Sequence, residues 1–501
     1  MAQVSDRQLD EESQTTFAQL APVGMAVAVV RKNKPVWTRG FGLRESGKDG
    51  IVDADTPFPI HSMTKSFTAT ALALLVDEGK IAWDDPVRQH IPEFAMSDPY
   101  VTEHLTIRDL LVHNSGLALG AGDLLHWPDQ RYTTGDIIAG LRYLPLEKGL
   151  RQGFAYDNLL YFMAGEVVAR ASGMTWSAFL HTRLLEPLGM SSCSTSTQDT
   201  QRHGGVSRIP AIQHARPAGG KPSPLPGIVQ SDDPAGSLSC SVRDIARWMQ
   251  FQLGDGTTPD GIRLLTAQRL DELHTAVVAM KPPRSIARLA GSHFNDVALG
   301  WFVSDFAGSY AIEHGGTGPG GMTNMILLPE QGAAVVVLVN DMVPAMMLSN
   351  RIADLIVRGD NASDWMGWVK EREARRAAQA SSEHDSNAQP PISAQAPRLP
   401  LDAYAGNYRD PWYGLIRVTR QKQGLRLHFT RSKLLEGPLL PWDGETFIAR
   451  WPDRSLEADA FVTFETNSQG KVTAMRVRPV SPRTDFSYDY AHLAPVREEV
   501  P

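Results

Sequence analysis

A serine and a lysine three positions apart, at the start of a helical run, constrain this 501-residue chain more than any other feature. Ser62 and Lys65 stand just before the largely apolar run 69–76, which predicts a buried helix. Residues i and i+3 lie on one helix face, so the lysine ammonium can reach the serine hydroxyl. A serine hydroxyl is a weak nucleophile that needs a neighbouring base, and the free N–H groups of a helix N-terminus favour a developing oxyanion. The pair predicts a nucleophilic serine; the plainer alternative is a helix cap beside a solvated lysine.

A second short motif contains a tyrosine and an asparagine two positions apart. Tyr156 and Asn158 stand just before a helical pattern that begins at Leu159. A tyrosine hydroxyl beside a serine–lysine pair can relay a proton, and an asparagine amide can hold a substrate carbonyl or the lysine. Taken alone, the motif equally fits a helix-capping turn.

The third motif is a glycine-rich run that follows a short predicted strand at 310–314. It begins at His314 and continues through Gly316 and Thr317 to residue 321. Glycines after a strand let the backbone pass close to a ligand. The N–H near Thr317 and that of Ser62 could together form an oxyanion hole, in which a donor is worth ~3–4 kcal/mol of transition-state stabilisation. The alternative is a mobile glycine loop.

The order of predicted elements indicates an α+β fold. Strands are predicted at both ends of the first 360 residues and helices between them, so one antiparallel sheet is built from both ends and flanked by helices, with an all-helical part in the middle. The predicted strands are 24–30, 36–42, 301–303, 310–314, 323–328 and 333–339, and a last helix covers about 345–357.

A change of composition divides the chain. Residues 366–400 run from an Arg/Glu-rich helical tail into a Ser-, Pro- and Gln-rich linker. Short alternating runs split by Gly, Asp and Asn follow from 401, and their regular spacing is typical of a small antiparallel barrel or sandwich. We therefore predict a catalytic domain over 1–365, a linker over 366–400 and a β domain over 401–501.

Composition excludes several classes of function. The net charge of −7 gives no reason to expect nucleic acid, and no apolar run approaches the ~20 residues of a membrane-spanning helix. The N-terminus has no basic and apolar leader pattern, which predicts a cytoplasmic protein, or a periplasmic one if a leader has been removed. Two cysteines do not make a disulfide framework, so we expect Cys193 and Cys240 to be reduced thiols. The sequence shows no metal-ligand spacing, and we expect neither metal nor cofactor.

Together, the three motifs occur in the order and at roughly the separations of the serine β-lactamase-like hydrolases. This family includes class C β-lactamases, penicillin-binding proteins, D-aminopeptidases and family VIII esterases, and the region after 400 resembles the lipocalin-like barrel appended to several of its peptidases. The resemblance implies that Ser62 is acylated, Lys65 assists its deprotonation and Tyr156 acts as general base and acid. It further implies that Asn158 orients substrate. Residues implied to bind substrate or form the oxyanion hole are His314, Gly316 and Thr317.

One departure from the family pattern bears on the substrate. His314 stands where β-lactamases have a lysine, and a histidine offers a charge to a substrate carboxylate only when protonated. If that charge matters, KM should rise between about pH 6 and 8. The departure favours peptides or esters over β-lactams, and the resemblance to the lipocalin-like barrel of the family's peptidases favours a peptidase. The chain also resembles bacterial peptidases of linearised microcystins, which implies cleavage at a D-Ala–Leu bond.

Several alternatives remain open from sequence alone. The chain could be a family VIII-type carboxylesterase, a weak β-lactamase or a non-catalytic penicillin-recognising sensor, and homo-oligomers are not excluded. His104 and His113 are expected to be structural. Trp127, in the polar segment 120–132, is either a core or rim residue or part of a lid over the cleft.

Overall fold

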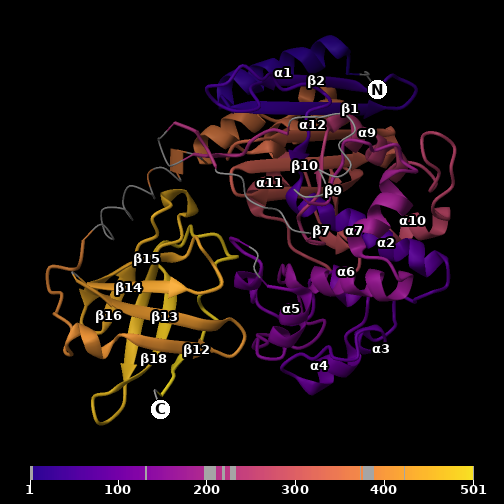
Figure 1. The fold of residues 1–501 in the computed structure, drawn as a ribbon. Helices are drawn as coiled ribbons and strands as arrows, with labels where there is room; N and C mark the ends of the chain where they lie inside the picture. The colour runs from indigo at the N-terminus through magenta and orange to yellow at the C-terminus, as the bar shows by residue number, and fades with distance from the viewer. Residues whose placement is uncertain are drawn as a thin grey trace.

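The computed structural model describes residues 4–129, 132–196, 210–216, 221–225, 233–372, 374–375, 378, 389–422 and 424–499. Its larger part is built on a seven-stranded antiparallel sheet with the order β2-β1-β11-β10-β9-β8-β7 (Figure 1). Residues from both ends of this part meet in the sheet, because β1 lies between β2 and β11. The predicted α+β fold is confirmed. The strands are β1 (Gly24–Arg31), β2 (Trp37–Gly42), β7 (Asn295–Ala298), β8 (Trp301–Phe306), β9 (Ser309–Gly318), β10 (Gly321–Leu328) and β11 (Ala333–Val339).

Both faces of the sheet are covered, which explains why its central strands are apolar without interruption. Along β1, Met25 and Val27 join a core with α1 (Asp6–Leu20) and α12 (Ala345–Arg358), whereas Ala26 and Ala28 join the core on the opposite face. Successive side chains of a strand point to opposite faces, so a strand buried on both sides must be apolar throughout.

The opposite face packs on helices from the middle of the chain. Helix α2 contacts α6, α7 and α10, and α9 contacts β1 and β11. This helical part includes the predicted all-helical region. Its helices are α2 (Thr64–Asp77), α3 (Val87–His90), α4 (Pro99–His104), α5 (Thr134–Leu141), α6 (Leu159–Ser172), α7 (Trp176–Leu180), α9 (Val242–Gln252) and α10 (Ala267–His274). Helix α11 (Arg284–Ala290) instead joins the core of α1 and α12.

The expectation of two reduced thiols is wrong. Cys193 and Cys240 form a disulfide, with their Cα atoms 4.2 Å apart. Backbone hydrogen bonds pair Ser194 with Ser239, which brings the two neighbouring cysteines together across 47 residues of sequence. Two cysteines in so long a chain say little about pairing, because the contact depends on a short strand, β6 (Ser239–Cys240), that the sequence does not signal.

The C-terminal part is a closed antiparallel barrel that lies beside the helical part (Figure 1). Its apolar interior belongs to the same contiguous core as the helices. The backbone N–H of Lys433 donates to the carboxylate of Asp129, and the Tyr132 hydroxyl donates to the Tyr413 carbonyl. Residues 373, 376, 377 and 379–388 of the predicted linker lie outside the described residues. The barrel strands are β12 (Gly406–Asp410), β13 (Gly414–Gln421), β14 (Gly424–Phe429), β15 (Glu436–Asp443), β16 (Thr446–Ala449), β17 (Ala460–Thr466), β18 (Val472–Pro479) and β19 (Val496–Arg497).

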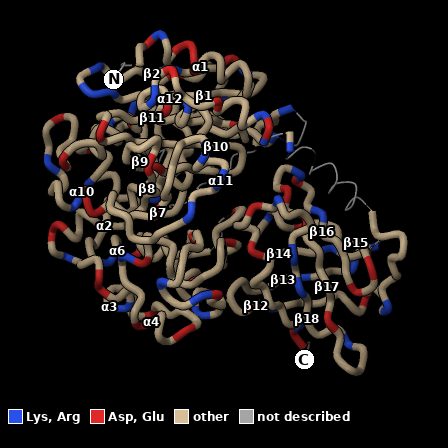
Figure 2. The backbone as a smooth tube through the Cα atoms, turned by 180° about the vertical axis from the view of Figure 1, so that it is seen from behind, with Lys and Arg blue, Asp and Glu red and all other residues tan. Residues whose placement is uncertain are grey.

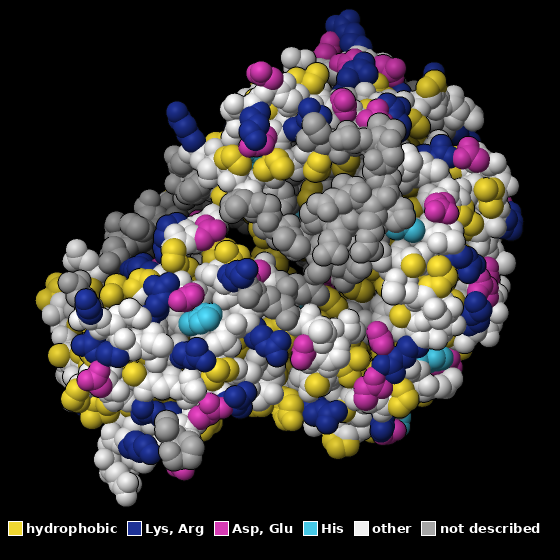
Figure 3. Space-filling model, viewed as in Figure 1, with side chains coloured by type: hydrophobic (Ala, Val, Ile, Leu, Met, Phe, Trp, Pro, Cys, Tyr) yellow, Lys and Arg dark blue, Asp and Glu magenta, His cyan; other side chains and the backbone are white. Residues whose placement is uncertain are grey.

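Charged side chains are mixed over the surface. Lysine and arginine alternate with aspartate and glutamate along the backbone trace (Figure 2) and over the face in Figure 3, where the barrel forms a separate lobe. Mixed charge of this kind does not form the basic stripe typical of nucleic-acid-binding proteins. Within the described part of the chain, no helix is long and apolar enough to cross a bilayer.

Candidate active site

Ser62 lies in a tight turn at the N-terminal end of α2. The turn, η1 (His61–Met63), follows the short strand β3 (Phe58–Pro59), where Pro57 and Pro59 fix an extended approach. The N–H of Ser62 therefore belongs to the helix-end donors that have no intrahelical partner. The preceding residue, His61, has φ +50°, a conformation that costs a non-glycine residue about 1–3 kcal/mol and tends to occur at functional sites.

Lys65 points from the first turn of α2 to the serine, as the sequence predicts. Its Nζ donates to Ser62 Oγ at 3.2 Å, to Asn158 Oδ1 at 2.8 Å and to the carbonyl of Ala235 at 2.9 Å. An ammonium has three donors, and these three acceptors occupy all of them. Lys65 is completely buried, so it is held as a fixed charge beside Ser62 and has no donor left for a substrate carboxylate.

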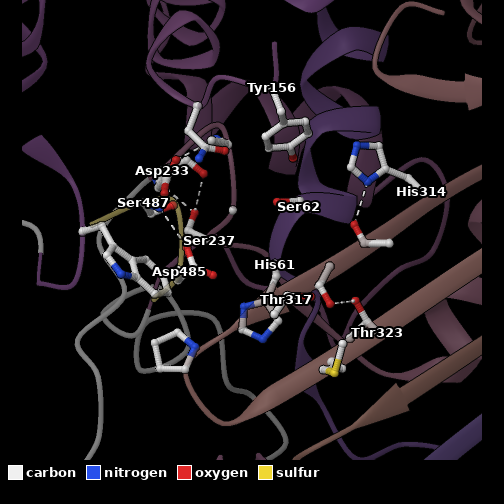
Figure 4. A pocket seen from close by; sticks show the side chains of 18 of the residues that line it. His61, Ser62, Tyr156, Asp233, Ser237, His314, Thr317, Thr323, Asp485 and Ser487 are labelled. Carbon is white, nitrogen blue, oxygen red and sulfur yellow. Dashed lines mark hydrogen bonds between the residues drawn. The ribbon is translucent and has the colours of Figure 1, made fainter. Parts of the chain in front are cut away.

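Tyr156 directs its hydroxyl towards Ser62 (Figure 4). The Lys65 ammonium lies 4.9 Å from the centroid of the tyrosine ring. The buried ring of His113 stacks on the Tyr156 ring, with centroids 4.3 Å apart, and its Nδ1 accepts the backbone N–H of Asp157. His113 thus supports Tyr156, while His104 stacks on Tyr100 outside the cavity.

The glycine-rich run is part of a strand rather than a mobile loop. Strand β9 continues through it to Gly318 and pairs with β10. A Cβ at Gly316 would lie 2.3 Å from the Ile60 carbonyl, and one at Gly318 would lie 2.3 Å from the His61 ring. Only glycine lets β9 approach the turn that carries Ser62 this closely. Gly316 and Thr317 therefore line the same cavity as Ser62.

His314 projects from β9 into the cavity and is neutral. Burial, helped by the charge of Lys65, lowers the pKa of His314 to about 3. Its Nδ1 lies 2.7 Å from the Gly315 carbonyl, so the neutral ring donates there and leaves Nε2 as an acceptor. The idea that His314 offers a positive charge to a substrate carboxylate near pH 6–8 is therefore wrong.

The opposite side of the cavity is acidic, and sequence reasoning missed it. Asp233, Asp485 and Ser487 face Ser62 from this side, whereas His314 and Thr317 lie across from them (Figure 4). Burial raises the pKa values of Asp233 and Asp485.

His126 lies among these acids. Burial lowers its pKa, but the hydrogen bond and charge of Asp123 and the charge of Asp233 outweigh this, so the net shift is upward. The sequence signal for this wall was the segment 120–132, one reading of which was a lid over the cleft. Nothing marked 485–487, because that segment belongs to the barrel.

Two adjoining cavities form the cleft. The one at Ser62 has a volume of about 420 Å³, and a neighbour of about 250 Å³ shares Trp127, Thr317, Pro319 and Asp485 with it. Trp127 lines both, so it lies at the cleft and not in the core. Among the described residues, no cluster of His, Cys, Asp and Glu is arranged to hold a metal ion.

Comparison with known proteins gives the family. A model of the beta-lactamase family matches residues 13–358 of the chain. The chain belongs to the beta-lactamase family. This confirms the resemblance drawn from the three motifs, and the chain is a serine hydrolase by family. A second model, of a domain of unknown function, matches residues 390–495 and so covers the barrel.

Relatives of this beta-lactamase-family chain extend the comparison. Unguisins hydrolase ungD' of Aspergillus campestris is 27% identical over 472 residues, which cover 89% of this chain and 84% of that protein. The octameric penicillin-binding protein homologue from Pyrococcus abyssi has a TM-score of 0.63 at 18% identity, covering 99% of this chain and 100% of that one. A class C beta-lactamase has a TM-score of 0.55 at 17% identity, covering 69% and 95%. The two structural likenesses show the shared fold.

Proposed function

We propose that this chain is a serine peptidase that hydrolyses linear peptides through an acyl-enzyme on Ser62. The observation that carries the proposal is the convergence of Ser62, Lys65 and Tyr156 at one cavity beside the N–H groups of Ser62 and Thr317. Ser62 Oγ attacks the scissile carbonyl carbon while Tyr156, polarised by Lys65, takes the serine proton. The two N–H groups receive the oxyanion.

The second half of the reaction uses the same groups. Tyr156 gives its proton to the nitrogen of the leaving amine as the C–N bond breaks. Water then attacks the acyl carbon while Tyr156 takes its proton; the bond between this carbon and Ser62 Oγ breaks, and Tyr156 gives the proton to Oγ. Asn158 holds Lys65 and faces the cavity, where its amide can also meet a substrate carbonyl.

The size and charge of the cleft favour a peptide with no carboxylate next to the scissile bond. The two adjoining cavities together offer more room than a small acyl ester requires. Lys65 has no free donor, His314 is neutral and no arginine or lysine lines the cavity at Ser62 within the described ranges. A site of this composition lacks the cation that a terminal carboxylate needs.

We further propose that the acyl group is a D-Ala residue, as in the D-Ala–Leu bond of linearised microcystin, which would leave a tetrapeptide. The support is the resemblance to peptidases and hydrolases of this family, of which the relative from Aspergillus campestris is one by name. A homo-oligomer is part of the proposal, supported by the octameric Pyrococcus abyssi homologue.

Mass spectrometry of linear peptides with an internal D-Ala, linearised microcystin among them, tests the proposal. We expect wild type to cleave after D-Ala and Ser62→Ala to leave the peptides intact. The L-Ala isomer of each peptide serves as the matched control. Equal cleavage of both isomers would contradict the D-Ala preference, and activity in Ser62→Ala would contradict the mechanism.

Short p-nitrophenyl esters separate the carboxylesterase alternative. A cavity without a cation to bind a substrate carboxylate suits an ester as well as an internal peptide bond. This observation supports the carboxylesterase alternative. Ester turnover without any peptide cleavage would select it. A stable acyl adduct on Ser62 without turnover would instead indicate a sensor.

A further inference from the structure

We infer that the C-terminal barrel positions the catalytic lysine through Ser487 and Asp123. This inference rests on the proposed role of Lys65. The barrel segment after β18 reaches the cavity, and three consecutive hydrogen bonds join it to the ammonium that donates to Ser62. The barrel is thus a working part of the active site, and Asp123 and Ser487 are positioning residues.

The chain of hydrogen bonds begins at the barrel. Ser487 Oγ donates to Asp123 Oδ2 at 2.8 Å, and the same oxygen accepts Asn158 Nδ2 at 2.8 Å. Asn158 Oδ1 in turn accepts Lys65 Nζ at 2.8 Å. All four side chains are buried, and a buried hydrogen bond is costly to break because the group left behind has no water to bond.

The direction of these bonds gives Asp123 a definite task. An asparagine amide has nearly the same shape in its two flipped orientations, so sterics alone cannot choose between them. An ionised carboxylate only accepts, and therefore draws the NH2 group of Asn158 towards Asp123. The amide oxygen is then left facing Lys65, whose ammonium only donates. Without the acceptor at Asp123, the amide could turn its NH2 group towards the ammonium, and Lys65 would lose one of its three partners.

Further contacts from the barrel hold the same segment of the catalytic part. The backbone N–H of Gly122 donates to Asp489 Oδ2 at 2.6 Å. Phe486 presents its ring edge-on to Tyr156, with centroids 6.0 Å apart. A Cβ at Gly120 would collide with Phe486, so this segment and the barrel are fitted closely together. The barrel therefore fixes the loop that carries Asp123 as well as the carboxylate itself.

The rate at which a fluorophosphonate probe labels Ser62 measures the reactivity of the serine without depending on the peptide specificity. Labelling forms the Oγ–P bond, breaks the P–F bond, releases fluoride and passes the serine proton to the Tyr156–Lys65 pair. Intact-mass spectrometry follows it in the full-length protein. If the wild-type protein is not labelled at Ser62, the result contradicts the proposed function. The role of the barrel is judged separately, from the rates of the variants.

We expect Ser487→Ala to slow labelling about tenfold and Asp123→Asn about 100-fold, since a misplacement of about 1 Å costs a factor of this order. With an ester substrate, the loss should appear in kcat and leave KM nearly unchanged. Thr484→Val is the matched control: its hydroxyl, in the same loop, donates to the Glu457 carbonyl within the barrel. This control should label at the wild-type rate.

The double variant tests whether Ser487 acts through Asp123. If Ser487 acts through Asp123, adding Ser487→Ala to Asp123→Asn should slow labelling no further. Multiplied effects, or a Ser487→Ala rate within twofold of wild type, would overturn the inference. So would equal losses in Ser487→Ala and Thr484→Val, because these would indicate general loosening of the loop. Circular dichroism checks that each variant is folded before its rate is interpreted.

Discussion

The two walls of the cleft are built in different ways. The wall formed by β9 and the Ser62 turn uses backbone: glycines bring the strand against the turn, and its histidine is neutral. The wall opposite uses side chains from three distant segments, 120–127, 233–238 and 485–489, and carries carboxylates. The first wall holds the groups that a reaction at a carbonyl requires. The second holds Lys65 in place and sets the charge that a substrate meets.

Lys65 belongs to both walls, so its loss has the largest expected effect. Lys65→Ala removes the charge beside Ser62 and leaves the Ala235 carbonyl and Asn158 Oδ1 without their donor. We expect kcat to fall by about 10³-fold, within the range for loss of acid–base assistance, measured with a p-nitrophenyl ester. Lys80→Ala is the control, because that lysine is half exposed and pairs with Glu78 at the surface. An active Lys65→Ala would mean that the two walls act independently.

The substitution Gly318→Ala tests the wall formed by β9 and the Ser62 turn. Gly318→Ala places a Cβ where the His61 ring now lies, so β9 must move away from the Ser62 turn. We expect kcat/KM for the same ester to fall about 100-fold, as for other misplacements of about 1 Å. In Gly135→Ala the added Cβ makes only an ordinary contact, and activity should stay at the wild-type level. If Gly318→Ala is equally active, the close approach is not required.

This contrast between the walls also explains what the sequence could predict. Ser62, Lys65, Tyr156 and the glycine run were found because each lies in a short local pattern, and the α+β fold followed from strands at both ends of the catalytic part. The pairing of Ser487 with Asp123 could not be found, because 364 residues separate them and neither lies in a pattern. The neutral state of His314 depends on burial, which spacing does not reveal.

Buried neutral histidines near the first wall predict loss of stability in acid. Burial lowers the pKa of His61 and His274 to about 4 and that of His314 to about 3. Between these values and the unfolded value near 6.5, the unfolded chain binds more protons than the folded one, so stability falls as pH is lowered. We expect Tm to drop by several degrees between pH 6.5 and 4.5. In His314→Gln the drop should be smaller than in wild type. An unchanged slope would mean that His314 is protonated in the folded protein.

The smallest expected effect concerns substrate charge. Because His314 stays neutral and Lys65 is fully engaged, KM for a peptide should not change between pH 6 and 8 through His314. Replacing the carboxylate of the residue after the scissile bond by an amide should change KM by less than about fivefold, since a surface-type ion pair is worth at most ~1 kcal/mol. Steady-state kinetics on paired acid and amide peptides measures both. A strong preference for the acid would contradict this and point to Arg216 or Arg483, which line the adjoining cavity.

The pairing of β1 with β11 has a consequence for synthesis on the ribosome. Strand β1 is apolar on both faces, yet its partner β11 emerges about 300 residues later. At 5–20 residues per second, the strand waits about 15–60 s before its neighbour exists. During that interval β1 can pair with β2, but its other edge and its apolar faces stay uncovered, which exposes the first 40 residues to association with other nascent chains.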